Sequence, residues 1–202
     1  MLKKKKFIVE GHRMPYELIV IGVSAGGLVA LSTIFPKLSA EFSIPIVVVQ
    51  HVGDDNSLLV EHLNNLCVIP VIEVEDKFAI QKNTIYIAPA GYHLLIEDKN
   101  TLALSFDPKV NYSRPSIDVL FESAADVFKE KLMGVVLSGA NTDGVSGAKK
   151  IKSQGGFVIV QSIETSEAKI MPAETIKMVN VDIILPLEDI GPFLQSVERK
   201  NE

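Results

Sequence analysis

Three side chains in the sequence have the types and the placement that serine-hydrolase chemistry requires. Ser24, His51 and Asp143 stand at the ends of three β-branched runs, or in the turns that follow them: ELIVIG, IPIVVVQH and MGVVLSG. The carboxyl ends of parallel strands share one edge of a sheet, so the three side chains are expected to converge there. A hydroxyl nucleophile, an imidazole base and a carboxylate that orients the imidazole form the full set for acyl transfer.

The glycine-rich turn around Ser24 leaves a second function open. Gly22 and Gly27 fall where the outer glycines of a dinucleotide-binding turn would stand, but Ser24 occupies the middle position, where a side chain blocks the pyrophosphate. The same letters spell G-x-S-x-G, the elbow that presents a nucleophile. A non-catalytic protein-interaction or nucleotide- or anion-binding module on the same fold is therefore the alternative. The second strand ends in Gln50 rather than in an acidic residue, which argues against nucleotide binding.

Each of the three residues also has an ordinary structural interpretation. Ser24 could cap the following helix, His51 could be a hydrogen-bonded residue after a buried strand, and Asp143 could be a cap or turn residue. Asp54 and Asp55 are rival carboxylates, but their position favours capping of the next helix. The spacing of His, Cys and acidic residues predicts no metal site, and acyl transfer of this kind needs no cofactor.

The elements that must position these residues follow from hydrophobic patterning. Apolar runs separated by helical patterns predict an α/β fold: a doubly wound, mostly parallel sheet flanked by helices on both faces, in a Rossmann-like three-layer sandwich. The clearest helix begins at Ser116. Residues 92–106 contain two strand-like runs around a polar turn, which predicts an antiparallel hairpin at a sheet edge. The predicted strands are ELIVIG, IPIVVVQH, PVIEVE, NTIYIAP, MGVVLSG, GGFVIVQ and VDIILP.

Composition narrows the class of protein. The 202 residues are 47% hydrophobic and 22% charged, as in an ordinary globular domain, with a net charge of -5. The sequence has no basic stripe of the kind that binds nucleic acid, so nucleic acid is not an expected partner. No apolar run is long enough to span a membrane, so an integral membrane protein is not expected. The single cysteine, Cys67, cannot form an internal disulfide, which favours the cytoplasm. We expect a short basic tail at 1–16 and one domain at 17–202.

With these residues in view, the chain resembles the CheB-type chemotaxis receptor methylesterases, which hydrolyse glutamate methyl esters on chemoreceptors. The motifs that carry the resemblance are IGVSAGG, QHV, YIAPAGYHL, SRPSIDVLF, LSGANTDGVSG and MPAETI. The resemblance implies a methylesterase catalytic domain at 17–202 with a Ser24, His51 and Asp143 triad. It also implies oxyanion donors on the backbone near Ala25 and Ala140, although the family's chemotaxis enzymes often have methionine at the second position.

The resemblance further implies substrates and a domain organisation. The expected substrates are cytoplasmic helices of methylated chemoreceptors, or a similar methylated protein, and receptor glutamines are implied as targets of a second, deamidating activity. Well-known members carry a phosphorylation-controlled receiver domain, for which the segment before residue 17 is too short. We therefore expect a stand-alone catalytic domain.

Arg114 is the expected substrate-binding residue. It precedes the helix that begins near Ser116, and the resemblance places its RPS segment near the catalytic cleft. A guanidinium beside the triad could hold the carboxylates of an acidic receptor helix. The alternative is a solvated arginine at a helix start.

Overall fold

The computed structural model describes residues 16–51 and 57–198, and its centre is a seven-stranded parallel sheet. The strands lie in the order β10 (Ile183–Leu185), β9 (Phe157–Gln161), β8 (Leu132–Val136), β1 (Leu18–Val23), β2 (Ile46–Gln50), β5 (Ile85–Ile87) and β3 (Val71–Glu73). These are the seven predicted strands. The doubly wound α/β fold predicted from the sequence is confirmed.

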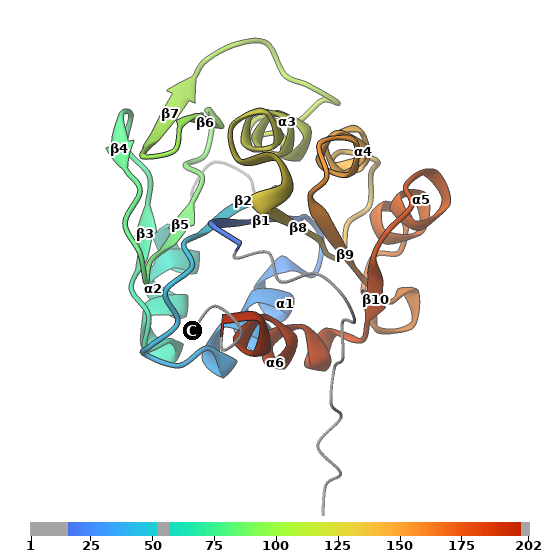
Figure 1. Cartoon of the computed structure of the whole chain (residues 1–202), viewed down its shortest axis with the longest axis horizontal. Helices are drawn as coiled ribbons and strands as arrows, with labels where there is room; N and C mark the ends of the chain where they lie inside the picture. Colours follow the sequence, from blue (N-terminus) through green and yellow to red (C-terminus); the bar gives the residue numbers. More distant parts are fainter. Residues whose placement is uncertain (1–15, 52–56, 199–202) are drawn as a thin grey trace, which may run out of the picture.

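Helices cover both faces of this sheet (Figure 1). One face carries α1 (Gly27–Ile34), α2 (Ser57–Leu66) and α6 (Leu187–Glu198), and the other carries α3 (Ile117–Phe128), α4 (Val145–Ser153) and α5 (Ile170–Met178). Short 3-10 turns lie at Phe35–Lys37, Lys129–Lys131 and Ile163–Thr165. Within the described ranges, no helix combines the length and the apolar character needed to cross a membrane.

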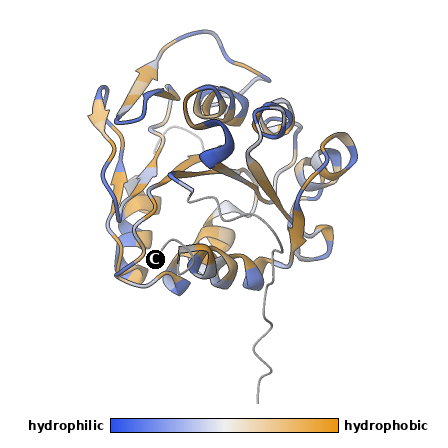
Figure 2. Cartoon of the chain, in the orientation of Figure 1, coloured by the Kyte–Doolittle hydropathy of each residue, from blue (hydrophilic) through white to orange (hydrophobic). Residues whose placement is uncertain are grey.

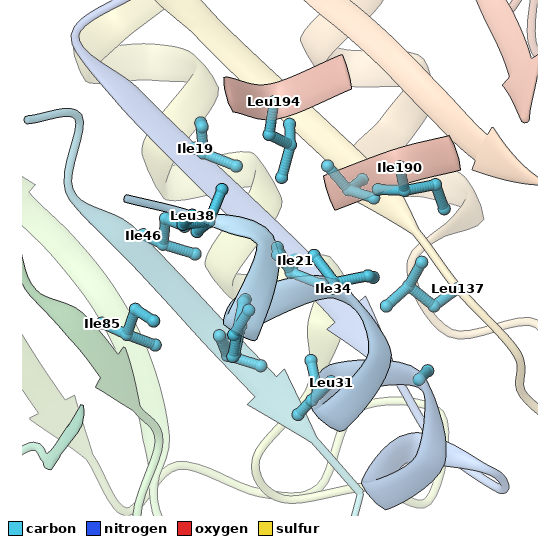
Figure 3. Close-up of a cluster of buried hydrophobic side chains, with 14 of the residues drawn as sticks. Ile19, Ile21, Leu31, Ile34, Leu38, Ile46, Ile85, Leu137, Ile190 and Leu194 are labelled. Carbon is cyan, nitrogen blue, oxygen red and sulfur yellow. The ribbon is translucent and has the colours of Figure 1, made fainter. Parts of the chain in front are cut away.

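Alternation of side chains along the strands builds two cores, one on each face of the sheet. On β1, Ile19 and Ile21 belong to the core under α1 and α6, whereas Leu18 and Val20 belong to the core under α3 and α4. Figure 3 shows the first core, and Figure 2 shows that the sheet strands are predominantly hydrophobic. Burial on both faces explains why these strands are continuous apolar runs.

The predicted hairpin forms, but its predicted position at an edge of the main sheet is wrong. Strands β6 (His93–Asp98) and β7 (Thr101–Ser105) pair antiparallel and, with β4 (Phe78–Ala79), make a separate three-stranded sheet. The physical reason is its apolar face. Leu94 and Ile96 are buried in the core that includes α3, and the Ile96 N–H donates to Ser123 Oγ of α3 at 3.1 Å.

The sheet order creates a topological switch point at the ends of β1 and β8. The chain leaves β1 through α1 toward β2, and it leaves β8 through α4 toward β9 on the opposite side. Strand order therefore reverses between these two strands. Open α/β sheets bind their ligands at this kind of switch point, beyond the carboxyl ends of the strands.

Candidate active site

Ser24 lies in a sharp turn between β1 and α1, at this switch point. Its backbone N–H donates to Ser138 O at 2.9 Å, and its carbonyl accepts from Gly27 N–H at 3.0 Å. Gly26 is the N-cap of α1, with a φ of 81° that favours glycine, and no side chain caps the helix. The interpretation of Ser24 as the helix cap is therefore wrong. The backbone is held firmly while the hydroxyl has no structural hydrogen bond to this helix.

Ser138 holds the turn in place, and the sequence analysis did not single it out. Its Oγ donates to Ala25 O at 2.7 Å and accepts from the Ala168 N–H at 2.8 Å, and the residue is fully buried. This one hydroxyl joins the Ser24 turn to the segment after β8 and to the segment before α5. Its only signal in the sequence was its place near the end of the predicted strand MGVVLSG.

His51 and Asp143 are in direct contact. His51 follows β2, and its Nε2 lies 2.8 Å from Asp143 Oδ2. The imidazole side chain is 13% exposed and the carboxylate is completely buried. Because an ionised carboxylate can only accept, Nε2 carries the proton and Nδ1 is the nitrogen left to act as a base.

The Asp143 carboxylate accepts hydrogen bonds from several further groups. The donors are Ile117 N–H at 2.7 Å, Ser116 Oγ at 2.9 Å, Asp118 N–H at 3.1 Å and Asn111 Nδ2 at 3.3 Å. Burial alone would raise the pKa of Asp143, but the hydrogen bonds from His51 and from this set outweigh it and hold the pKa below its usual range. Asp143 therefore stays ionised.

Asp143 is also a helix cap, although of a different helix from the one that follows it. The N-cap of α4 is Gly144, with no side-chain bond, whereas the carboxylate of Asp143 receives the first N–H groups of α3. An anion at a helix N-terminus is stabilised by the helix dipole and by unpaired N–H groups. The structural and the chemical interpretations of this residue are compatible.

Two residues that the sequence analysis missed complete the surroundings of Asp143. Asp118 of α3 accepts from Gly144 N–H at 2.9 Å and Gly147 N–H at 2.7 Å, so α3 and α4 cap each other. Burial raises the pKa of Asp118 to about 6; the charge of Asp143 also raises it, while those backbone bonds lower it. Asn111 Nδ2 bridges the two carboxylates, at 2.8 Å from Asp118 Oδ2.

The predicted oxyanion donors are the backbone N–H groups of Ala25 and Ala140. Ala25 and Ala140 are both exposed, and within residues 16–51 and 57–198 neither backbone N–H has a hydrogen-bond acceptor. Ala25 follows Ser24, and Ala140 lies in the segment after β8 that Ser138 ties to the Ser24 turn. Unpaired N–H groups at the start of a helix or loop can bind developing negative charge.

Two other histidines within the described residues have hydrogen-bond partners away from the triad. His62 of α2 bonds Ser32 at 3.1 Å, and buried His93 lies between the Ser116 N–H at 3.2 Å and Pro108 O at 3.1 Å. Asp54 and Asp55 fall outside the described residues. Among the residues that are described, no group of three His, Cys, Asp or Glu side chains could hold a metal ion.

Arg114 is partly buried, and its guanidinium contacts its own segment. Its guanidinium lies 3.8 Å from the centroid of the Phe106 ring, and Nη1 donates to the carbonyls of Phe106 and Asp107 at 3.1 and 3.0 Å. Arg114 is therefore not the fully solvated side chain of the alternative interpretation. Through these contacts, which we call the Arg114 clamp, Arg114 holds Phe106 and Asp107 close to the start of α3. The proposed contact of Arg114 with substrate stays a prediction.

This clamp should contribute to stability. We expect Arg114→Lys to lower the free energy of unfolding by about 1–2 kcal/mol, because lysine keeps the charge but loses the ring stacking and the paired carbonyl bonds. Urea unfolding of wild type and variant measures the difference. Lys109→Ala, at an exposed position of the same segment, is the matched control and should be neutral. An unchanged Arg114→Lys would show that the clamp does not stabilise the fold.

Comparison with known proteins decides the family. The model of the family described as CheB methylesterase matches residues 19–194, which is most of the chain. The chain belongs to the CheB methylesterase family. The crystal structure of the Thermotoga maritima CheB methylesterase catalytic domain superposes with a TM-score of 0.86 at 34% identity, over 91% of this chain and 100% of that one.

Relatives in this family carry consistent names. A Leptospira interrogans protein, provisionally named protein-glutamate methylesterase/protein-glutamine glutaminase, is 48% identical over 93% of this chain and 98% of its own length. The Symbiobacterium thermophilum protein-glutamate methylesterase/protein-glutamine glutaminase is 35% identical over 90% of this chain and 50% of its own length. The Myxococcus xanthus protein-glutamate methylesterase FrzG is 35% identical, over 89% and 54% respectively.

Cys67 should not contribute to the chemistry of this CheB methylesterase family member. It is half-buried after α2, and burial raises the pKa of its thiol to about 11. Because the thiolate is the reactive form, we expect iodoacetamide at pH 8 to alkylate the folded protein at least about tenfold more slowly than the urea-unfolded protein. Mass spectrometry measures the rate, and hydrolytic activity should survive the treatment. Rapid alkylation with loss of activity would contradict this assignment.

Proposed function

We propose that this protein is a serine hydrolase that cleaves glutamate methyl esters on chemoreceptors and releases methanol. The observation that carries the proposal is the His51–Asp143 pair, hydrogen-bonded at 2.8 Å beside the Ser24 turn, in a member of the CheB methylesterase family. The alternative of a non-catalytic or nucleotide-binding module is not favoured, because relatives across the family are named as enzymes of this kind.

In the first half of the proposed reaction Ser24 is acylated. Ser24 Oγ attacks the ester carbonyl carbon while His51 Nδ1 takes its proton, and Asp143 stabilises the resulting imidazolium. The backbone N–H groups of Ala25 and Ala140 hold the oxyanion of the tetrahedral intermediate. The imidazolium then protonates the methoxy oxygen, the carbon–oxygen bond breaks, and methanol leaves.

The second half repeats these steps with water. His51 removes a proton from a water molecule, whose oxygen attacks the acyl carbon, and the proton passes to Ser24 Oγ as the glutamate carboxylate is released. A glutamine side chain in place of the ester would release ammonia by the same route. The glutaminase part of the relatives' names supports this second activity.

The proposed partners are the cytoplasmic helices of a methylated chemoreceptor or of a similar methylated protein, which places the reaction in the cytoplasm. FrzG of Myxococcus xanthus, named as a protein-glutamate methylesterase, supports a protein substrate. The single cysteine is consistent with a reducing compartment.

Methanol release tests the proposed function. The purified protein is incubated with a chemoreceptor cytoplasmic fragment that a methyltransferase has labelled with radioactive methyl groups, and volatile label is counted. We expect release with wild type and only background release with His51→Ala. Addition of EDTA should change nothing, because the proposed steps use only side chains and backbone N–H groups. Absence of release with the wild-type protein would contradict the proposal.

A further inference from the structure

A tight turn beside the triad carboxylate carries a fully exposed aromatic side chain. Val110 and Ser113 exchange backbone hydrogen bonds of 3.1 and 2.8 Å, and the two residues between them, Asn111 and Tyr112, have φ values of 49° and 63°. Two successive positive φ values are the pattern of a type I′ turn. Tyr112 is 97% exposed.

The turn is anchored directly to the proposed catalytic group. The Asn111 amide nitrogen bonds Asp143 Oδ1 at 3.3 Å, while the other oxygen of Asp143 receives His51 Nε2. The same amide bonds Asp118, and the Arg114 clamp lies one residue beyond Ser113. The turn therefore lies next to the triad at a fixed position, in the connection that arches from β7 to α3 (Figure 1).

The backbone conformation of Tyr112 is strained, and its side chain makes no compensating packing contact within the fold. A left-handed backbone is unfavourable for a bulky side chain, whereas asparagine and glycine adopt it with little strain. A ring that is 97% exposed gains nothing from burial within its own domain. Backbone strain beside a reaction centre is often part of function, which indicates that the Tyr112 side chain contacts another molecule.

Other exposed apolar side chains lie on the same rim of the sheet. Leu28 and Val29 begin α1 just after the Ser24 turn, and Ile170 begins α5, which follows β9. In a parallel sheet these helix starts share the edge that carries the site. Exposed apolar side chains gathered at one place mark a surface that binds another molecule.

We propose that the Val110–Ser113 turn docks the substrate protein, with Tyr112 packing on an apolar side chain that flanks the esterified glutamate. The proposal rests on the proposed function. The turn is well placed to contact a protein segment that carries a glutamate ester to Ser24, because Asn111 fixes the turn to Asp143 and Asp143 bonds His51. Tyrosine suits the role, since it offers a large contact area at low conformational cost.

Substrates of two sizes test the proposal. We expect Tyr112→Asn to raise the Michaelis constant for a methylated chemoreceptor fragment about tenfold, as for a central aromatic contact. Hydrolysis of a small N-acetylglutamate γ-methyl ester should stay within twofold, because that ester lacks the flanking side chain on which Tyr112 is proposed to pack. The melting temperature should not fall, because asparagine tolerates the left-handed backbone.

The control variant is Val68→Ser, an exposed apolar position between α2 and β3 at the opposite edge of the sheet, which should leave both substrates unaffected. An unchanged Michaelis constant for the fragment with Tyr112→Asn, or equal losses on both substrates, would overturn the docking proposal. So would a wild-type dimer, seen by sedimentation, that Tyr112→Asn converts to monomer, because a second copy would then cover the ring. Failure of the wild-type protein to release methanol from the fragment would instead contradict the proposed function.

Discussion

Replacing Ser24 with alanine is expected to lower ester hydrolysis by about 10⁴- to 10⁶-fold, the loss that follows removal of a triad nucleophile. The stability of the fold should not change. Gly26 rather than Ser24 caps α1, and the backbone bonds of Ser24 to Ser138 and Gly27 do not involve the hydroxyl. Rates on a small methyl ester and the urea unfolding midpoint of the same preparation measure both quantities.

Ser32→Ala is a suitable control for this variant. Ser32 lies further along α1 and bonds His62, so its removal deletes a hydroxyl from the same helix without touching the site. Its activity should equal that of wild type. If Ser24→Ala retained turnover within about tenfold of wild type, a loss far below that of any triad nucleophile, Ser24 would not be the nucleophile.

Asp143→Asn should damage both activity and stability, in contrast to Ser24→Ala. Activity is expected to fall by about 10³- to 10⁴-fold, because an amide no longer selects the imidazole tautomer with its proton on Nε2. The free energy of unfolding should fall by about 2–4 kcal/mol, since a buried NH₂ would face groups that donate hydrogen bonds. Those groups include Ile117 N–H and Ser116 Oγ.

The pH dependence separates this effect from a general loss of packing. The hydrogen bonds of Asp143 hold its folded-state pKa below the unfolded value, so its stabilisation is present above about pH 4 and is lost as the pH falls through the folded-state pKa. The stability gap between wild type and Asp143→Asn should therefore narrow on acidification. Asp107→Asn, at an exposed carboxylate, is the matched control. A gap that stays constant down to pH 2 would contradict this account.

The sheet and its layers could be predicted from the sequence because strands that are buried on both faces are continuous apolar runs. Such runs can be recognised without knowing which strands are neighbours. All seven predicted strands belong to the parallel sheet. The predicted position of the hairpin was wrong. The sequence of residues 92–106 shows that apolar and polar side chains alternate, but it does not show which element the apolar face packs against. Leu94 and Ile96 pack toward α3 instead of extending the main sheet.

For the site, residue type and position at strand ends were sufficient to place Ser24, His51 and Asp143 at one rim, and the structure brings His51 and Asp143 into contact. Their catalytic roles stay predictions. Ser138 and Asn111 could not be predicted, because their hydrogen bonds connect segments far apart in the chain: Ser138 reaches Ala168, and Asn111 reaches Asp143. Arg114 was placed correctly near the α3 start, but its partners are carbonyl oxygens of its own segment.

Covalent trapping tests the central claim, that Ser24 is a nucleophile activated by His51, most directly. The wild-type protein is treated with a fluorophosphonate and the adduct is located by peptide mass mapping. We expect one phosphonyl group per chain, on Ser24, with loss of ester hydrolysis in proportion to labelling and negligible labelling of His51→Ala. Full ester hydrolysis by a protein whose Ser24 stays unlabelled, or a stoichiometric adduct on another residue, would contradict the claim.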